Sequence, residues 1–471
     1  MEKQRLIRSL VYIDIPTQSK VLFPVTQLLK ESQKYSPLIY LDGSRHDLKS
    51  IQEECEENSY DYVLDTDNSI KRESLTSRSH EREPSQNTES KIAVKPRSFL
   101  IEFLSYSRFL KSTFRFFLRL LKENEIQLLL VTRDGIGHNY NILVKAAKRM
   151  NISVVIIPFT VANAVEPALK IYLDYNHRIK SGIARMVASI YSNWVYKFRG
   201  SKLLRLRAPH ILASELFGFG TKQPWLDYSG NADFIAVESE FMKDYYLSEN
   251  IPNAKLKFTG SLYEDKLTVN IKNGENEKRA LFDKYGWDIS KKLILCAFPP
   301  IYEGREKLLD QNYFYFKTLG ELIDFWIDSL VSCSNAQVII NPHPRSKLKF
   351  MKHIEEKGVV IITDELVKLM PLCDIFVASM SATIRMAVAC GKPVLNYDMN
   401  KYGYTDFIDI AGVITVEEKD QFEQELKKLT DQEEYYKQVE AAQIEKSNYF
   451  GTLDGKAKER TLKVLDDLFR N

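Results

Sequence analysis

Cysteines and long apolar runs are scarce in this sequence of 471 residues. The cysteines are scattered and include no Cys-x-x-Cys pair; they are Cys55, Cys296, Cys333, Cys373 and Cys390. An odd, unpatterned set argues against a zinc site and favours a reducing compartment. No apolar run approaches membrane-spanning length, and the one near the start is too short for a signal peptide. We therefore expect a cytoplasmic protein.

Motifs of several common enzyme classes are also absent. Gly135-Ile136-Gly137 lacks the third glycine of a dinucleotide fingerprint, and no phosphate-loop, HExxH or EF-hand pattern occurs. Asp65-Thr66-Asp67 has the Asp-x-Asp form of a metal bridge, but it lies where a polar segment begins, which favours a solvated turn. We therefore predict an activity with no metal site and no bound cofactor.

The size and composition of the chain indicate two domains. An apolar content of 44% is typical of packed globular proteins, and 471 residues exceed what one core usually organises. From about residue 66 to 97 the chain is almost entirely polar, too polar to offset the entropy cost of ordering, so we predict a mobile insertion there. With a linker at 270–279, the predicted domains are 1–269 and 270–471.

Short buried strands alternate with helices, which predicts the α/β class with parallel sheets. Two strands in the C-terminal half run into polar turns. One turn is Asn341-Pro342-His343-Pro344-Arg345, and the other is Ser379-Met380-Ser381-Ala382-Thr383, which opens a helix. Because ligands bind at the carboxyl ends of parallel strands, we expect both turns to contact a ligand.

The residue types in these turns suit a phosphate or diphosphate. His343 is held between two prolines that stiffen the turn, and imidazole with the Arg345 guanidinium suits a phosphate. Ser379, Ser381 and Thr383 place three hydroxyls beside a helix N-terminus, which offers free N–H groups and a positive dipole end. A single serine would be an ordinary helix cap, but three hydroxyls within five positions favour an anion site.

The two turns, in this order, resemble the donor half of GT-B glycosyltransferases. The pattern is most similar to that of bacterial sialyltransferases and polysialyltransferases, which use CMP-sugars, and the CDP-glycerol transferases of wall polymers share a similar layout. The resemblance implies two Rossmann-like domains facing a cleft. It also implies that His343 and the hydroxyls of Ser379, Ser381 and Thr383 hold the phosphate of the nucleotide.

A candidate general base lies in the N-terminal half, in the turn Arg133-Asp134-Gly135 after a predicted strand. The sialyltransferase group has an acidic-Asp-Gly turn there whose Asp is the base, although this chain has Arg133 in place of the acid. A carboxylate is the usual group that removes a proton from an acceptor hydroxyl. An Asp before Gly is also common in simple turns, and His138 and Glu215 are rival bases.

Two segments are basic and apolar with few acids. One runs from Arg97 to Lys122 and has Glu102 as its only acid; the other runs from His177 to His210 and has none. We expect helices at 99–122 and 179–198. Basic amphipathic helices are typical of membrane-surface elements, so we predict contact with an anionic membrane surface or an anionic glycan. No nucleic-acid module is recognisable.

Together these features predict a metal-independent glycosyltransferase of the GT-B type. It would move a sugar, with a CMP-activated acidic sugar as the predicted donor, to a hydroxyl of a bacterial surface glycan. One alternative is a UDP-sugar 2-epimerase, which would need carboxylates at the donor site, where this chain has Arg385. Others are a CDP-polyol phosphotransferase and a non-catalytic glycan-assembly protein.

Overall fold

The computed structural model describes residues 6–44, 46–65, 98–137, 139–159, 163–180, 182–299, 315–343, 346 and 348–470. The predicted insertion at 66–97 lies outside these ranges, as do His138 and Arg345. The chain forms two compact units. The first comprises Met1–Val237, Tyr245–Thr259 and Lys458–Asn471, and the second comprises Glu238–Asp244 and Gly260–Ala457.

This division is less simple than one boundary after residue 269. The C-terminal helix α17 (Ala457–Asp467) lies almost wholly in the first unit. There Asp466 accepts a hydrogen bond from the Tyr35 hydroxyl at 2.9 Å, and Arg460 Nε donates to the carbonyl of Thr259 at 2.9 Å. The last helix is therefore held by the first unit's own residues.

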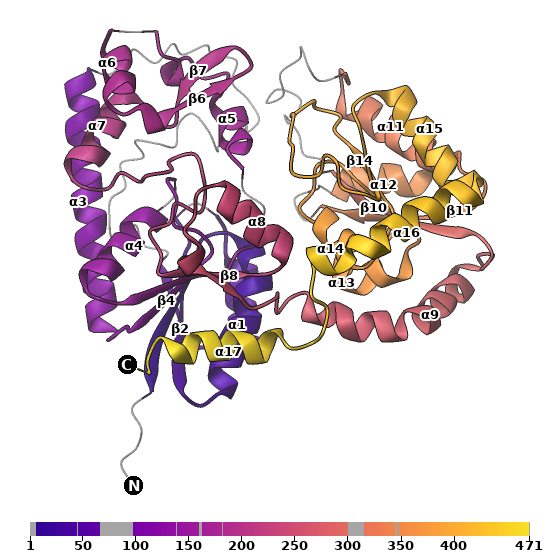
Figure 1. The fold of residues 1–471 in the computed structure, drawn as a ribbon, viewed down its shortest axis with the longest axis horizontal. Coiled ribbons are helices and arrows are strands. Elements are labelled where there is room, and N and C mark those ends of the chain that lie inside the picture. Colours follow the sequence, from indigo (N-terminus) through magenta and orange to yellow (C-terminus); the bar gives the residue numbers. More distant parts are fainter. Residues whose placement is uncertain are drawn as a thin grey trace. The chain divides into compact units, whose positions relative to one another are not determined.

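The first unit is built on a seven-stranded parallel sheet (Figure 1). In sheet order its strands are β3 (Tyr62–Asp65), β2 (Tyr35–Asp42), β1 (Ile7–Ile13), β4 (Leu128–Val131), β5 (Ser153–Ile156), β8 (Phe234–Val237) and β9 (Leu256–Phe258). All four residues of β4 are fully buried, because a central parallel strand is covered on both faces. The order reverses between β1 and β4, where ligands of such sheets bind.

Helices connect these strands, as the alternating pattern predicted. They are α1 (Ser19–Glu31), α2 (Lys49–Glu57), α3 (Phe99–Glu123), α4 (Tyr140–Arg149), α5 (Val165–Ile171), α6 (Gly182–Ile190), α7 (Ala208–Leu216) and α8 (Glu240–Ser248). In α3 the buried residues include Leu110, Phe117 and Leu121, whose helical spacing puts them on one face. Within the part of the chain that the structure describes, no helix is long and apolar enough to cross a membrane.

The helix predicted at 179–198 is wrong. Helix α6 ends at Ile190, and the chain then forms an antiparallel hairpin of β6 (Val195–Phe198) and β7 (Ser201–Leu204). Arg199 and Gly200 both have positive φ angles, 45° and 75°, as a two-residue type I′ turn requires. The two-residue turn and the aromatic residues around it favour a hairpin more strongly than the spacing of the basic residues favours a helix.

The linker predicted at 270–279 is also wrong, because these residues lie inside α9 (Asp265–Tyr285). The segment is polar because α9 is largely exposed, with Leu267, Gly274 and Phe282 as its buried residues. Gly274 packs beside Pro371, where an added Cβ would be 3.6 Å from the proline ring. The polar composition of residues 270–279 therefore reflects the solvent exposure of a helix, and it does not indicate a linker.

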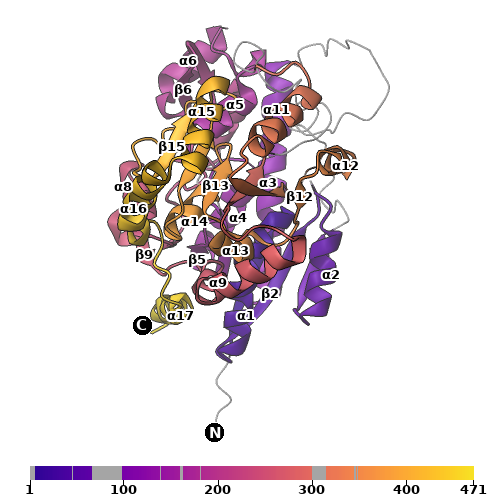
Figure 2. The same ribbon diagram turned by 90° about the vertical axis from the view of Figure 1, so that its right-hand side faces the viewer.

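The second unit has a six-stranded parallel sheet, which confirms the predicted α/β class with two Rossmann-like units. In sheet order its strands are β12 (Val360–Ile361), β11 (Ala336–Pro342), β10 (Lys292–Phe298), β13 (Ile375–Ala378), β14 (Val394–Tyr397) and β15 (Val413–Val416). Its helices after α9, several of which face the viewer in Figure 2, are α11 (Leu319–Val331), α12 (Leu348–Glu356), α13 (Leu366–Leu369), α14 (Ile384–Ala389), α15 (Lys419–Asp431) and α16 (Glu433–Phe450).

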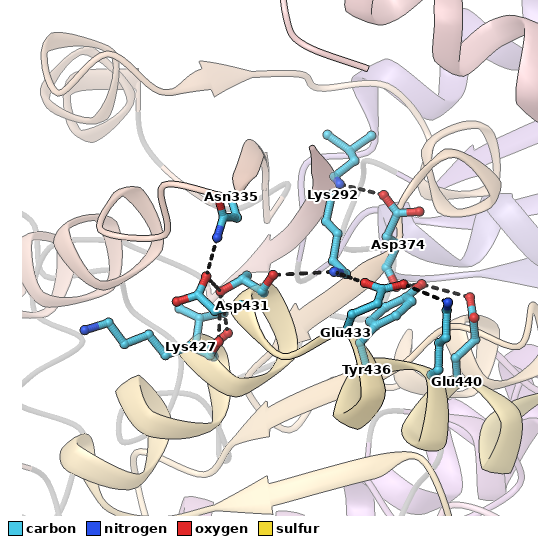
Figure 3. Close-up of polar contacts among 12 residues, drawn as sticks. Lys292, Asn335, Asp374, Lys427, Asp431, Glu433, Tyr436 and Glu440 are labelled. Carbon is cyan, nitrogen blue, oxygen red and sulfur yellow. Dashed lines mark hydrogen bonds and ion pairs between the residues drawn. The ribbon is translucent and has the colours of Figure 1, made fainter. Parts of the chain in front are cut away.

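Ion pairs tie helices to the amino ends of strands in this sheet (Figure 3). Lys278 donates to both carboxylate oxygens of Asp374, at 2.8 and 2.7 Å, and the N–H of Leu293 donates to the same carboxylate at 2.6 Å. Lys292, at the start of β10, pairs with Glu433 at 2.8 Å. These charges are satisfied by one another, so this edge serves the fold, and candidate ligand contacts are expected at the opposite edge.

Candidate functional site

The carboxyl edge of the second unit's sheet carries both turns that the sequence singled out. Strand order reverses between β10 and β13. Register places Pro342 of β11 beside Phe298 of β10, and Ala378 of β13 beside Ala297. His343 and Ser379 therefore follow strands that flank β10 and end at nearly the same level. Two strand spacings separate their backbones by about 10 Å.

Asn341 anchors the end of β11, just before His343. The Asn341 side-chain amide donates to the carbonyls of Ile362 and Asp364, at 2.8 and 2.9 Å. The carbonyl of His343 accepts from the N–H of Ser346 at 2.8 Å. His343 is half-buried.

The turn after β13 contains a residue with a strained backbone conformation, which an amide side chain holds in place. Met380 has a positive φ of 46°, a conformation that costs a residue with a Cβ about 1 kcal/mol or more. Its N–H donates to the side-chain oxygen of Asn396, on β14, at 2.8 Å. The hydroxyls of Ser381 and Thr383 lie 2.8 Å apart. Strain held in place by a neighbouring strand is common at ligand sites.

The helix predicted after this turn exists, but α14 has only six residues. Its first residue, Ile384, follows the hydroxyl pair directly. A six-residue helix aligns few peptide dipoles, so the predicted contribution of a helix N-terminus is small. The hydroxyls of Ser379, Ser381 and Thr383 then become the main polar groups of this turn, and all three residues are half-buried.

A charged cluster missed by the sequence analysis lies one turn further along. Arg385 points inward, and its Nη1 lies 3.4 Å from Oε1 of Glu238, with 10% of each side chain exposed. Burial raises the pKa of Glu264 to about 7; Arg385 lowers it, while Glu238 and Asp265 raise it further. The cluster therefore contains a carboxyl group that can hold a proton near neutral pH. No local motif marks it, because its members are far apart in the sequence.

The proton on Glu264 gives a testable dependence of stability on pH. Its pKa is higher in the folded protein than its ordinary value of 4.5, so its stabilising contribution is complete below that value and is lost as pH rises through about 7. We expect Glu264→Gln to raise the melting temperature at about pH 8 and to change it much less at about pH 5. Glu275→Gln, on the exposed face of α9, is the control. An equal shift at both pH values would contradict the prediction.

In the first unit, the side chain of Asp134 stabilises a turn of the backbone. Asp134 is fully buried. Its carboxylate accepts three backbone N–H groups, from Ser229 at 2.5 Å, Asn231 at 2.6 Å and Ala232 at 2.8 Å. Burial raises the pKa of Asp134, and these hydrogen bonds lower it. A carboxylate placed in this way fixes the 229–232 turn and has no exposed oxygen for an acceptor hydroxyl.

The neighbouring Asp227 is the carboxylate of this region that reaches solvent. Its side chain is 19% exposed and pairs with Arg133 at 2.9 Å. Its carbonyl accepts the N–H groups of Asp134 and Gly135, at 3.0 and 2.9 Å. Gly135 is required here, because an added Cβ would lie 2.3 Å from the carbonyl oxygen of Leu226. The Arg133-Asp134-Gly135 turn therefore positions Asp227 at the carboxyl end of β4.

Arg133 is itself held in place by its surroundings. Burial alone would lower its pKa, but the Asp227 carboxylate and other nearby acidic groups raise the pKa above its ordinary value. Its guanidinium carbon lies 5.6 Å from the ring centre of Tyr140 and 5.2 Å from that of Phe159. The arginine that departs from the family pattern is therefore the fixed partner of Asp227.

A buried polar network lies beside it, where the strand order reverses between β1 and β4. The Tyr140 hydroxyl donates to Asp14 at 2.5 Å, and the Gln18 amide donates to Asp14 at 3.0 Å. The Tyr12 hydroxyl donates to Asp42 at 2.5 Å. Burial and the nearby carboxylates raise the pKa of both tyrosines, so they remain donors. The network makes this edge of the sheet rigid.

The third candidate base, Glu215, is engaged in a hydrogen bond. Its Oε1 accepts a hydrogen bond from Nε1 of Trp194 at 2.7 Å. Gly220 packs against the same carboxylate so closely that an added Cβ would lie 2.2 Å from Oε1. Glu215 therefore supports the packing of α7 against the segment before β6.

Two doubly wound parallel units define the GT-B fold, and comparison with solved structures agrees. The chain is similar to UDP-GlcNAc 2-epimerase from Neisseria meningitidis bound to UDP-GlcNAc, at 17% identity and a TM-score of 0.53, over 99% of this chain and 100% of that chain. It is similar to an S. aureus MnaA–UDP structure, at 13% identity and a TM-score of 0.54, over 98% and 97%.

It is also similar to a variant of the wall teichoic acid polymerase TagF, at 11% identity and a TM-score of 0.51, over 99% of this chain and 90% of that chain. No family model matches the sequence, and no curated protein sequence matches it. At these identities the likeness establishes the fold and leaves the reaction to be argued from the site.

Proposed function

We propose that this protein is a glycosyltransferase that moves a sugar from a nucleotide donor to an acceptor hydroxyl. The observation that carries the proposal is the placement of His343 and the Ser381–Thr383 hydroxyl pair on either side of β10, where the strand order of the second sheet reverses. Two similar structures hold UDP-GlcNAc or UDP, which supports a nucleotide-sugar substrate, and a third is a wall teichoic acid polymerase by name.

The proposed roles divide between the two units. In the second unit, His343 and the Ser379, Ser381 and Thr383 hydroxyls bind the phosphate of the donor, with Arg345 as a further contact. The acceptor oxygen attacks the anomeric carbon, the bond from that carbon to the phosphate oxygen breaks, and the nucleotide leaves with the electron pair. Positive and hydrogen-bonding groups at that phosphate stabilise the leaving charge without a metal.

The first unit would supply the acceptor site and the base that takes the hydroxyl proton. The sequence pointed to Asp134 or His138. The burial of Asp134 favours Asp227 as the base, because Asp227 lies at the carboxyl end of β4, is partly exposed and is oriented by Arg133. His138 remains a rival base.

The proposed donor is a CMP-activated acidic sugar, and the proposed acceptor is a hydroxyl of a bacterial surface glycan. Both rest on the resemblance of the two turns to sialyltransferase motifs. The unpatterned thiols favour a cytoplasmic setting. A CDP-polyol donor fits the same phosphate contacts, so the nucleotide must be identified by experiment.

A thermal-shift panel of CMP, CDP, UDP and GDP, with their sugars, tests the donor. A ligand that binds the folded protein stabilises it by about 2.7 kcal/mol at a hundredfold excess over its dissociation constant. We expect a cytidine nucleotide to raise the melting temperature most. A response to UDP-sugars alone would reject the CMP donor, and no response to any nucleotide would favour a non-catalytic assembly protein.

One observation favours a second candidate, a UDP-sugar 2-epimerase. The Glu238–Glu264 pair supplies carboxylates in the second unit, and the pKa of Glu264 near 7 suits proton transfer. An epimerase needs no acceptor. Incubating the protein with a UDP-sugar alone and finding the C2 epimer would establish this activity, whereas transfer that depends on an added glycan would establish the glycosyltransferase.

A further inference from the structure

The exposed side of α3 carries an unbroken basic row. Its exposed basic side chains are Arg108, Lys111, Arg115, Arg119 and Lys122, spaced three or four residues apart and opposite the buried residues Leu110, Thr113 and Phe117. The row spans about 21 Å of helix. None of the five makes an ion pair within the described ranges of the chain. The row is therefore a dense positive surface.

The acid in the first turn of α3 does not offset this charge. Glu102 turns inward, where it lies 3.4 Å from Nη1 of Arg207, and 15% of its side chain is exposed. Along the exposed row the next acid is Glu123, at the end of the helix. Lys111 Nζ lies 3.9 Å from the ring centre of Phe217, a contact that leaves its positive charge in place, so the basic row can still attract an external anionic partner.

Exposed aliphatic side chains continue this row. On α3, Leu100, Ile101 and Leu104 are 60%, 57% and 44% exposed and lie on the same side of the helix as the basic row. On α6, the exposed fractions of Ile183, Met186 and Ile190 are 45%, 52% and 61%, at helical spacing. These six residues and the basic row are called the α3–α6 face below.

The two helices pack on one small core. Phe99, at the start of α3, packs with Ala184 and Val187 of α6 and with Ile211 of α7 in a small core. Figure 1 shows α3, α6 and α7 adjacent at one end of the first unit. The exposed aliphatic side chains of α6 therefore lie on a helix that packs beside the first turn of α3.

We propose that the α3–α6 face docks this protein on an anionic membrane surface. A soluble polyanion would match the basic row but would leave the aliphatic side chains in water. A bilayer with anionic lipids matches both, because its headgroups attract Lys and Arg while its interface accepts aliphatic side chains. The sequence had assigned the second contact to a helix at 179–198. The structure assigns it to α6, whose outward side is chiefly aliphatic.

This proposal is independent of the reaction, and flotation of the full-length protein with vesicles tests it. We expect binding to phosphatidylcholine vesicles that contain phosphatidylglycerol and none to phosphatidylcholine alone. Binding should weaken steeply with salt, since the screening length falls to about 3 Å at 1 M. Replacing Arg108, Lys111, Arg115 and Arg119 by Glu should weaken binding roughly a hundredfold or more.

A matched control has the same change in net charge on the second unit. It replaces the exposed residues Lys272, Arg279, Lys284 and Lys427 by Glu and should bind vesicles nearly as the unmodified protein does. Equal loss in both variants would mean that net charge alone acts, and it would overturn the proposal.

The aliphatic part is tested by a separate variant. Ile183→Ser, Met186→Ser and Ile190→Ser together should weaken binding to the anionic vesicles at low salt while leaving the circular dichroism spectrum unchanged, because all three side chains are exposed. The opposite result would be that the protein binds heparin but shows no preference for anionic over neutral vesicles. That result would assign the α3–α6 face to a soluble polyanion and overturn the membrane proposal.

Discussion

His343→Ala is expected to abolish most transfer activity while leaving the protein folded. The imidazole follows β11 at the edge where the donor phosphate is proposed to lie, and losing one preorganised contact to a developing charge typically lowers turnover about 10²–10³-fold. The fold should persist because Asn341 and the register of β11 with β10 hold the strand end. Single-turnover kinetics with the identified donor would measure the effect.

His353→Ala is the matched control for this substitution. His353 is a half-buried histidine of the same unit, on α12, whose Nε2 lies 2.9 Å from Asp324. Turnover should be unchanged in this variant. If His343→Ala, shown to be folded by circular dichroism, turns over at a near-normal rate, the donor-site assignment fails.

The largest expected effect on stability comes from Asp134→Asn. One carboxylate oxygen would be replaced by an N–H donor that faces the backbone N–H groups of Ser229 or of Asn231 and Ala232. Leaving one or two buried donors unsatisfied costs about 2–5 kcal/mol, a large share of a typical unfolding free energy. Urea denaturation would show this as a lower midpoint.

Asp227→Asn should separate transfer from donor binding. Its ion pair with Arg133 is largely buried, with 19% of the Asp227 side chain and 13% of the Arg133 side chain exposed, so losing the charge should lower the unfolding free energy by about 1–3 kcal/mol. Loss of a general base, in contrast, lowers transfer about 10²–10⁴-fold while donor binding persists. If Asp134→Asn is stable but inactive and Asp227→Asn is active, Asp134 is the base and the assignment made from burial is wrong.

The sequence alone determined the α/β class and the main elements around the proposed donor edge. Its strands are short runs of buried apolar residues, a local property that periodicity reports directly. The turns after β11 and β13 were also visible, because His-Pro and a cluster of hydroxyls are contiguous in the chain. Each turn is a run of adjacent residues, so recognising it needs no knowledge of the tertiary structure.

Only the tertiary structure separated residues that look alike in sequence. Asp134 and Asp227 are both loop aspartates, but one is closed off by three backbone N–H groups and the other reaches solvent. Likewise, Glu238, Glu264 and Arg385 are far apart along the chain and meet only after folding. Burial and long-range pairing are set by how the strands are ordered and packed, and single-residue patterns carry little information about either.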